Sequence, residues 1–381
     1  MSTIKVTNIE HGSTTDGGIQ LDSSGHVTID GVQLPTSGAL SSRRININGA
    51  MQVAQRGTVV NAGNEYGGPD RHKLSKNEGA YTISQATDAP TGSGFSNSFK
   101  IDVTSAGSDS TAGNYVSMEH KIEGQDLQLL KKGTSSAEKL TVQFWIKTTV
   151  TGTYVLEFRD TDNTRVICKT YTVSASNTWE KKTLTFDADT TGTLSNDNTE
   201  AVSLQWWLLA GSTYSGGTLQ TTWAALTNAN RAVGQVNAVD DTSNEIYFTG
   251  IQIEVGEKAT PFEHRSYGDE LARCQRYFQR ISGDNDAYTY PSKGQGTGSV
   301  DVTIPLCVPL RASPTMNAID SRTFTDSSSF AASSSTAPTT SHFNANNPHL
   351  AVNCGGFSGL TNNEVSVWGP RSNALEISAE L

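Results

Sequence analysis

The chain has 381 residues and carries 28 Lys and Arg against 38 Asp and Glu, which gives a formal net charge of −10 at pH 7. A general nucleic-acid-binding protein is usually basic, so this balance argues against such a role. Only 17% of the residues are charged and 35% are hydrophobic, while Ser, Thr, Asn and Gln are abundant. Coiled coils and helical bundles are rich in Ala, Leu, Glu and Lys, so the composition disfavours them.

The sequence shows no pattern typical of a secretory signal, a membrane helix or a disulfide framework. The first ten residues contain one lysine and no apolar stretch, unlike a secretory signal. No apolar run is long enough for a membrane helix, so we expect no membrane insertion. The four cysteines lie tens of residues apart without a CxxC pair, which disfavours a disulfide scaffold and a zinc ribbon. We expect reduced and mostly buried thiols.

Residues 1–44 are rich in Gly, Ser and Thr and contain short runs in which apolar and polar residues alternate. The alternating apolar residues are Ile19 and Leu21, Val27 and Ile29, and Val32 and Leu34. Such alternation between Gly and Asp turn signals predicts short strands. So few strands do not bury a core alone. We therefore expect a slender attachment segment that pairs with another domain or with other copies of the chain.

Residues 45–265 show many short strand patterns separated by Gly, Asn, Asp and Ser, with almost no helical periodicity. The predicted strands are Ile45–Val53, Ala80–Ile83, Phe99–Val103, Asn114–His120, Leu140–Lys147, Thr153–Arg159, Val166–Val173, Glu180–Phe186, Val202–Leu209 and Glu245–Val255. This pattern predicts an all-β fold with a jelly-roll β-sandwich as the main domain.

A connecting helix is predicted over residues 266–282. Ser266 and Asp269 fit a capping box, and an apolar stripe at helical spacing follows, formed by Leu271, Cys274, Phe278 and Ile281. Residues 283–381 then predict a smaller C-terminal β-sandwich domain. Its expected strands are Gly298–Val308, Leu350–Asn353, Glu364–Trp368 and Ala374–Ala379, and its Ser-rich stretch Ser327–Ser341 is expected to be a surface loop.

Signatures of catalysis are missing, since no G-x-S-x-G, H-E-x-x-H, Walker A or complete G-x-G-x-x-G motif is present. We therefore expect no enzyme activity, no catalytic residues and no cofactor. Two D-x-D pairs, Asp160/Asp162 and Asp187/Asp189, raise the possibility of a structural calcium ion. A calcium loop that starts at Asp187 would need a bidentate Glu at its twelfth position, which is Asn198. Ordinary turns are thus favoured, and no metal site is predicted.

Three aromatic residues are candidates for carbohydrate binding. In the strand pattern Val202–Leu209, side chains alternate between faces, so Trp207 falls on the polar face. Tyr214 and Trp223 follow in a segment rich in Gly, Ser and Thr. An aromatic ring on a polar face can stack against a sugar. The alternative interpretation is that Trp207 is covered by a loop or by a neighbouring subunit.

Several stretches resemble a bacteriophage tail-fibre or receptor-binding protein family that has a carbohydrate-binding-like jelly-roll domain. The most specific is ATPFEHRSYGDELARCQRYF at residues 259–278, and INGAMQVAQRGT at residues 47–58 is similar to the opening of the same domain. The resemblance implies structural roles at the joint between two domains for Phe262, Glu263, His264, Arg265, Tyr267, Cys274 and Phe278. It carries no catalytic residues.

The resemblance further implies a structural virion protein of a tailed phage, made in the host cytoplasm. It would be a homotrimer, would join other tail proteins through residues 1–44, and would bind a host-surface glycan of lipopolysaccharide or capsule. Two alternatives stay open: an architectural tail or fibre-adaptor protein without a ligand, and a polysaccharide depolymerase. The usual depolymerase scaffold is a repetitive β-helix, and no internal repeat is visible in the sequence.

Overall fold

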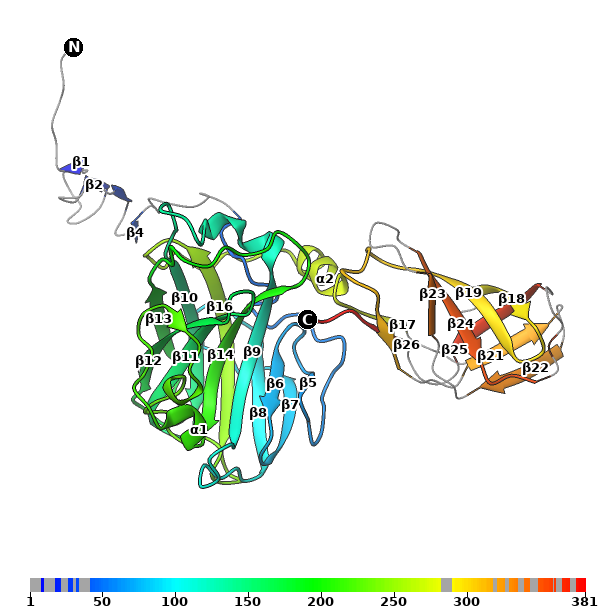
Figure 1. Cartoon of the computed structure of the whole chain (residues 1–381), viewed down its shortest axis with the longest axis horizontal. Helices are drawn as coiled ribbons and strands as arrows, with labels where there is room; N and C mark the ends of the chain where they lie inside the picture. The colour runs from blue at the N-terminus through cyan, green and yellow to red at the C-terminus, as the bar shows by residue number, and fades with distance from the viewer. Residues whose placement is uncertain are drawn as a thin grey trace, which may run out of the picture. The chain divides into compact units, whose positions relative to one another are not determined.

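The structure is a computed structural model in which the chain forms two compact units. Unit 1 comprises Met1–Gln52 and Gly57–Arg265, and unit 2 comprises Val53–Arg56 and Ser266–Leu381. The residues that the structure describes are 8–9, 18–21, 27–29, 32–33, 42–281, 290–317, 321–325, 329–334, 339–342, 349–358, 360, 365–370 and 375–381. Strands dominate both units (Figure 1).

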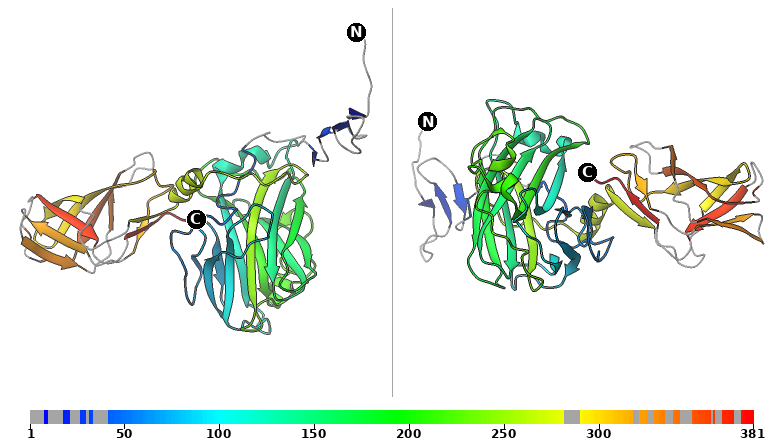
Figure 2. Two further views of the ribbon diagram at one scale, coloured as in Figure 1. Left: turned by 180° about the vertical axis from the view of Figure 1, so that it is seen from behind. Right: turned by 60° about the horizontal axis from the view of Figure 1, so that its bottom comes forward.

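The part of unit 1 that follows residue 44 is a jelly-roll β-sandwich of two antiparallel sheets (Figures 1 and 2). The five-stranded sheet has the order β13 (Glu180–Phe186), β10 (Leu140–Thr148), β16 (Glu245–Val255), β8 (Ser98–Ser105) and β7 (Ala80–Ala86). The seven-stranded sheet has the order β15 (Ala224–Ala225), β12 (Arg165–Val173), β11 (Gly152–Asp160), β14 (Glu200–Ala210), β9 (Tyr115–Glu123), β6 (Lys73–Lys76) and β5 (Glu65–Tyr66). The predicted all-β fold class is thereby confirmed.

Aromatic side chains fill the space between the two sheets. Phe144 of β10 packs edge-on against Tyr171 at 5.1 Å and Trp206 at 5.8 Å between ring centroids, and lies 6.3 Å from Phe248. All four are buried in one core cluster. Each strand places alternate residues in this core, so the other half of each strand faces outward.

The described part of residues 1–44 contains a four-stranded antiparallel sheet. Its strands pair in sequence order and are β1 (Asn8–Ile9), β2 (Ile19–Leu21), β3 (Val27–Ile29) and β4 (Val32–Gln33). The alternating pattern thus predicted strands correctly at Ile19, Val27 and Val32. The attachment role of this segment stays a prediction, and most of its residues lie outside the described ranges.

Unit 2 also has two sheets and its own core. The order of the three-stranded sheet is β17 (Phe278–Ile281), β26 (Leu375–Ser378) and β20 (Thr315–Met316). The order of the seven-stranded sheet is β22 (Ser329–Ser334), β21 (Ser321–Thr325), β25 (Val365–Pro370), β18 (Tyr290–Gln295), β19 (Ser299–Pro305), β24 (His349–Gly355) and β23 (Thr339–His342). Trp368, Ile304 and Ile377 are fully buried in the core of this unit.

Three local predictions were wrong. The helix α2 covers only Tyr267–Gln275, and Phe278–Ile281 forms strand β17 instead of continuing the helix to residue 282, because its backbone pairs with β26. Ile45–Val53 is not a strand, because Asn48 and Met51 adopt positive φ angles of 57° and 56° within a turn. The stretch Ser327–Ser341, expected to be a loop, contains β22 and β23.

The remaining helical segments are short, namely η1 (Gly124–Leu130), α1 (Ser212–Ser215) and η2 (Asn228–Asn230). In the described parts of the chain, no helix has both the length and the apolar character needed to span a membrane.

Candidate functional site

The outer face of the seven-stranded sheet in unit 1 carries a row of polar side chains across its three central strands. Glu157 of β11 pairs in register with Gln205 of β14, which pairs with Glu119 of β9. The next row contains Arg159 and Ser203. These residues alternate along their strands with core residues such as Trp206 and Leu204, so the alternation directs them outward.

A continuous chain of hydrogen bonds links this row to a residue from a distant loop. Gln205 Nε2 donates to Glu119 Oε1 at 2.7 Å, and Arg231 Nη2 donates to Gln205 Oε1 at 2.9 Å. Arg231 also binds Glu157 in a bidentate manner, with Nε to Oε2 and Nη2 to Oε1 both at 2.9 Å. Trp207 Nε1 donates to the same carboxylate at 3.0 Å. The network is buried and therefore holds its side chains in one arrangement.

Aromatic rings form one wall of this region. The ring centroids of Trp207 and Tyr214 are 5.3 Å apart, and those of Tyr214 and Tyr115 are 5.7 Å apart. The Arg231 guanidinium lies 5.1 Å from the centroid of the Trp207 ring. Trp207 is only 1% exposed, so it supports the wall from beneath, whereas Tyr115 and Tyr214 remain partly exposed. The short helix α1 and the return of the chain at Ala232, whose N–H donates to the Tyr214 carbonyl at 2.8 Å, position Tyr214.

These groups surround a pocket of about 220 Å³. It is lined by Ser75, Tyr115, Glu119, Arg159, Gln205, Trp207, Tyr214 and Arg231. The lining therefore offers guanidinium and amide donors, a carboxylate acceptor and aromatic faces within one small space. Recognition sites for polar small molecules combine these same features.

Burial changes the protonation behaviour of two groups in this site. It raises the pKa of Glu119, although the charges of Lys121 and Lys73 act in the opposite direction. For Arg231, burial acts to lower the pKa, but the contact with Glu157 more than compensates and raises it. Arg231 thus stays charged, and Glu119 holds its proton at a higher pH than a carboxyl in water does.

The three aromatic candidates do not all meet at the pocket. Trp207 and Tyr214 line it, but Trp223 lies beside the core, with its ring 4.9 Å from that of Phe158 and its Nε1 donating to the Asp187 carbonyl at 2.7 Å. Sequence reasoning missed Glu119, Gln205 and Arg231, as well as Glu157 and Arg159. The available signal was the alternation of polar residues along β9, β11 and β14.

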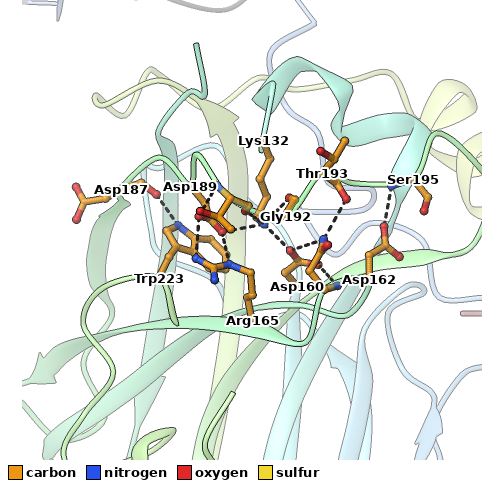
Figure 3. Close-up of polar contacts among 12 residues, drawn as sticks. Lys132, Asp160, Asp162, Arg165, Asp187, Asp189, Gly192, Thr193, Ser195 and Trp223 are labelled. Atoms are coloured by element: carbon orange, nitrogen blue, oxygen red, sulfur yellow. Dashed lines mark hydrogen bonds and ion pairs between the residues drawn. The ribbon is translucent and has the colours of Figure 1, made fainter. Parts of the chain in front are cut away.

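One aspartate of each D-x-D pair contacts the Lys132 side chain (Figure 3). Lys132 Nζ contacts Asp160 Oδ2, Asp189 Oδ2 at 2.9 Å and the Gly192 carbonyl at 2.9 Å. Arg165 binds both oxygens of Asp189, at 2.8 and 2.9 Å. Burial acts to raise the pKa of Asp189, but the hydrogen bonds from Arg165 and Lys132 together lower it.

No group of three or more His, Cys, Asp or Glu residues is placed to hold a metal ion within the described ranges. The Lys132 ammonium group is bound by Asp160 and Asp189, one residue from each pair. Asp162 accepts a hydrogen bond from the N–H of Ser195, which lies 33 residues later in the chain, at 2.8 Å. Asp189 accepts from the Thr191 N–H at 3.0 Å and Asp160 from the Asn163 N–H at 2.9 Å, as in ordinary turns.

The residues of the 259–278 stretch make close local contacts. Phe262 packs edge-on against Phe95 at 4.8 Å, and His264 lies 4.8 Å from Phe262. The Glu263 carboxylate accepts from the Arg44 N–H at 2.7 Å, and Arg265 donates to the Asn46 carbonyl at 3.2 Å. The contacts of Glu263 and Arg265 tie the segment that follows β16 to residues 44–46 of the same unit.

In unit 2, the rest of this stretch begins with Tyr267, which is 58% exposed. Cys274 is buried on α2, and Phe278 is buried beneath the Arg56 guanidinium, 3.5 Å from its ring centroid. Residues 53–56 and 278 thus pack together within unit 2.

No protein-family model matches the sequence, and no curated protein matches it. Similar solved structures include the enzymatically active domain of tailspike protein 4 from bacteriophage CBA120, with a TM-score of 0.29 and 14% identity over 52% of this chain and 21% of that chain. A family 4 carbohydrate-binding module has a TM-score of 0.27 and 13% identity over 55% of this chain and 97% of that module. A family 11 carbohydrate-binding module from Clostridium thermocellum has a TM-score of 0.25 and 14% identity. The match covers 55% of this chain and 98% of that module.

The match thus spans about a fifth of the tailspike domain's own length.

Proposed function

We propose that the chain is a non-enzymatic glycan-binding protein and that the pocket on the seven-stranded sheet holds one sugar unit. The observation that carries this proposal is the composition of the pocket lining. Sugar hydroxyls both donate and accept hydrogen bonds, and the pocket provides Glu119 as acceptor and Arg159 as donor. The apolar face of a sugar ring can pack on Tyr115 or Tyr214.

The size of the pocket supports a small ligand. Pockets for drug-sized molecules span ~300–1,000 Å³, and this one measures about 220 Å³. A single sugar residue, or the end of a glycan chain, is therefore a better fit than a longer segment.

The carboxylates favour binding over hydrolysis. Most glycosidases use two carboxylates on opposite sides of the scissile bond. Among the described residues that line the pocket, Glu119 is the one carboxylate. Glu157 is fully buried and is engaged by Arg231 on both oxygens. This arrangement supports a binding role for the site.

The test is a glycan array followed by calorimetry on the full chain. Glu119→Gln and Tyr214→Ala are each expected to weaken binding by about tenfold or more, because each removes a direct contact. Glu257→Gln and Tyr267→Ala are matched controls at exposed positions outside the pocket and should bind as the wild type does. If the folded wild-type chain bound no glycan on a broad array, the architectural alternative would be favoured. If it released reducing sugars from host polysaccharide, a depolymerase would be favoured.

We also propose, from the resemblance at residues 259–278, that the chain acts in a phage tail fibre as a homotrimer. In this role it would bind host lipopolysaccharide or capsule and would join other tail proteins through residues 1–44 in the virion. A stable monomer in light scattering at micromolar concentration would exclude the trimer. Normal incorporation of a chain without residues 1–44 into particles would exclude the attachment role.

A further inference from the structure

Arg159 is a cation of the pocket whose charge the described residues leave unmatched. It lies on β11 and lines the pocket, next to Ser203 in the register of β14. Its Nε is buried and has no hydrogen-bond partner in the described parts of the chain. The Ser203 hydroxyl is also buried and also has no hydrogen-bond partner there. Buried donors are almost always paired, so an external acceptor at this point would complete the site.

The second cation of the pocket behaves differently. Arg231 forms a bidentate ion pair with Glu157 and a further hydrogen bond with Gln205. The protein therefore neutralises one guanidinium internally and leaves the other directed at the pocket. A guanidinium binds carboxylate and phosphate groups through paired N–H donors.

The neighbouring charges leave the pocket slightly positive. Lys121 is paired with Glu200 at 2.7 Å, as Arg231 is with Glu157. Two cations, Arg159 and Lys73, then remain near one carboxylate, that of Glu119. Burial raises the pKa of this carboxyl group. A locally cationic site is notable on a chain with a net charge of −10, and it favours a ligand that carries negative charge.

We propose that the pocket takes an acidic saccharide and that Arg159 binds the carboxylate or phosphate group of this ligand. The proposal rests on the glycan-binding function proposed above and specifies its ligand class. Glu119 and Gln205, which also line the pocket, contact the hydroxyl groups of the sugar ring.

The experiment compares binding of matched probes to the full chain by calorimetry. The probes are galacturonic acid and glucuronic acid oligosaccharides, glucose 6-phosphate, and the neutral galactose and glucose oligosaccharides. We expect one of the acidic probes to bind about 10- to 100-fold more tightly than its neutral parent, as a charge-assisted pair predicts. The preference should decrease as salt is added. The uronate and phosphate arms identify which anion is recognised.

Variants at Arg159 separate this proposal from a general effect on the pocket. Arg159→Gln should bind the acidic probe and its neutral parent about equally well, and Arg159→Lys should retain part of the preference for the acidic probe. Lys139→Gln, at an exposed position outside the pocket lining, is the control. Thermal unfolding should show that Arg159→Gln is as stable as the wild type, because Arg159 has no described partner to lose.

Two results would overturn the inference. If the wild type bound neutral and acidic probes equally well, the ligand class would be wrong while the glycan-binding function would stand. If the folded chain bound none of the probes and no glycan on a broad array, both the glycan-binding function and the acidic ligand class would be wrong.

Discussion

The ammonium group of Lys132 is enclosed by the protein on several sides. Its side chain is 3% exposed and that of Asp160 is fully buried. Besides the two carboxylates, it contacts the carbonyls of Thr191 and Gly192 at 3.2 and 2.9 Å, and it lies 4.9 Å from the centroid of the Trp223 ring (Figure 3). Removing one partner from a buried ion pair leaves the other charge uncompensated, which makes such a residue costly to replace.

Lys132→Met should therefore lower the free energy of unfolding by about 3–5 kcal/mol, because the Asp160 and Asp189 carboxylates would lose their shared cation. Denaturant unfolding measures this change. Lys131→Met is the matched control at the adjacent residue, whose side chain is 54% exposed and paired with Glu138. Its expected effect is within about 1 kcal/mol.

A double variant distinguishes the loss of charge pairing from a loss of side-chain packing. Lys132→Met combined with Asp160→Asn should recover part of the lost stability, because the double variant buries one uncompensated charge fewer. Equal stability of the single and double variants would contradict the electrostatic account.

At the scale of strands and helices, a strict period of two was the most informative pattern. Val202–Leu209 was predicted as a strand and lies within β14 (Glu200–Ala210), because its alternation matches a sheet with one face in the core. The apolar spacing from Leu271 to Ile281 predicted one helix and was wrong beyond Gln275. The partner of β17 is β26, about a hundred residues away, and no local pattern reveals such a pairing.

The same limit applies to the pocket. The sequence placed Trp207 on the polar face of its strand and Tyr214 nearby, and both line the pocket. Glu119 meets Gln205 across 86 residues, and Arg231 comes from a loop after η2. The alternation along the strands indicates that Glu119 and Gln205 face outward, but only the order and register of the strands bring them together with Arg231.

An irregularity in β16 gives a prediction about a glycine. The register between β10 and β16 shifts between Gln143 and Trp145, and Gly250 lies at this point with a φ of +61°. A Cβ at Gly250 would lie 2.7 Å from Phe95 Cζ. Gly250→Ala should destabilise the chain by roughly 2–4 kcal/mol in thermal or denaturant unfolding, because it combines backbone strain with a steric clash.

Gly234→Ala is the control for this prediction. Its φ of +86° imposes a comparable backbone penalty, but no atom lies within 4 Å of the added Cβ. We expect a loss of about 1 kcal/mol. If the two variants were equally destabilised, contact with Phe95 would not be the reason for glycine at the irregularity in β16.

For the molecule as a whole, the core of unit 1 contains a pair of histidines. The rings of His72 and His120 are 5.0 Å apart and both residues are buried, 0% and 1% exposed. Burial lowers the pKa of His72 to about 3, with the charge of Arg71 acting in the same direction. Burial also lowers the pKa of His120 well below its ordinary value, and His72 and Arg71 add to this effect.

These pKa shifts predict a loss of stability in mildly acidic solution. In the unfolded chain both histidines take up protons as the pH falls below about 6.5, while the folded state excludes those protons. The unfolded state therefore binds more protons, and stability falls as the pH decreases. Between pH 7 and pH 5.5 the expected loss is about 1.2 kcal/mol for each histidine.

Denaturant unfolding at pH 7 and at pH 5.5 measures this loss. His72→Gln/His120→Gln should remove most of the difference between the two pH values, and each single variant should remove about half. His349→Gln, at an exposed histidine of unit 2, should leave the difference unchanged. Carboxylates with lowered pKa values, such as Asp189, lose their contribution only at lower pH, below about 4. A pH dependence that persisted in the double variant would therefore assign the acid sensitivity to groups other than the buried histidine pair.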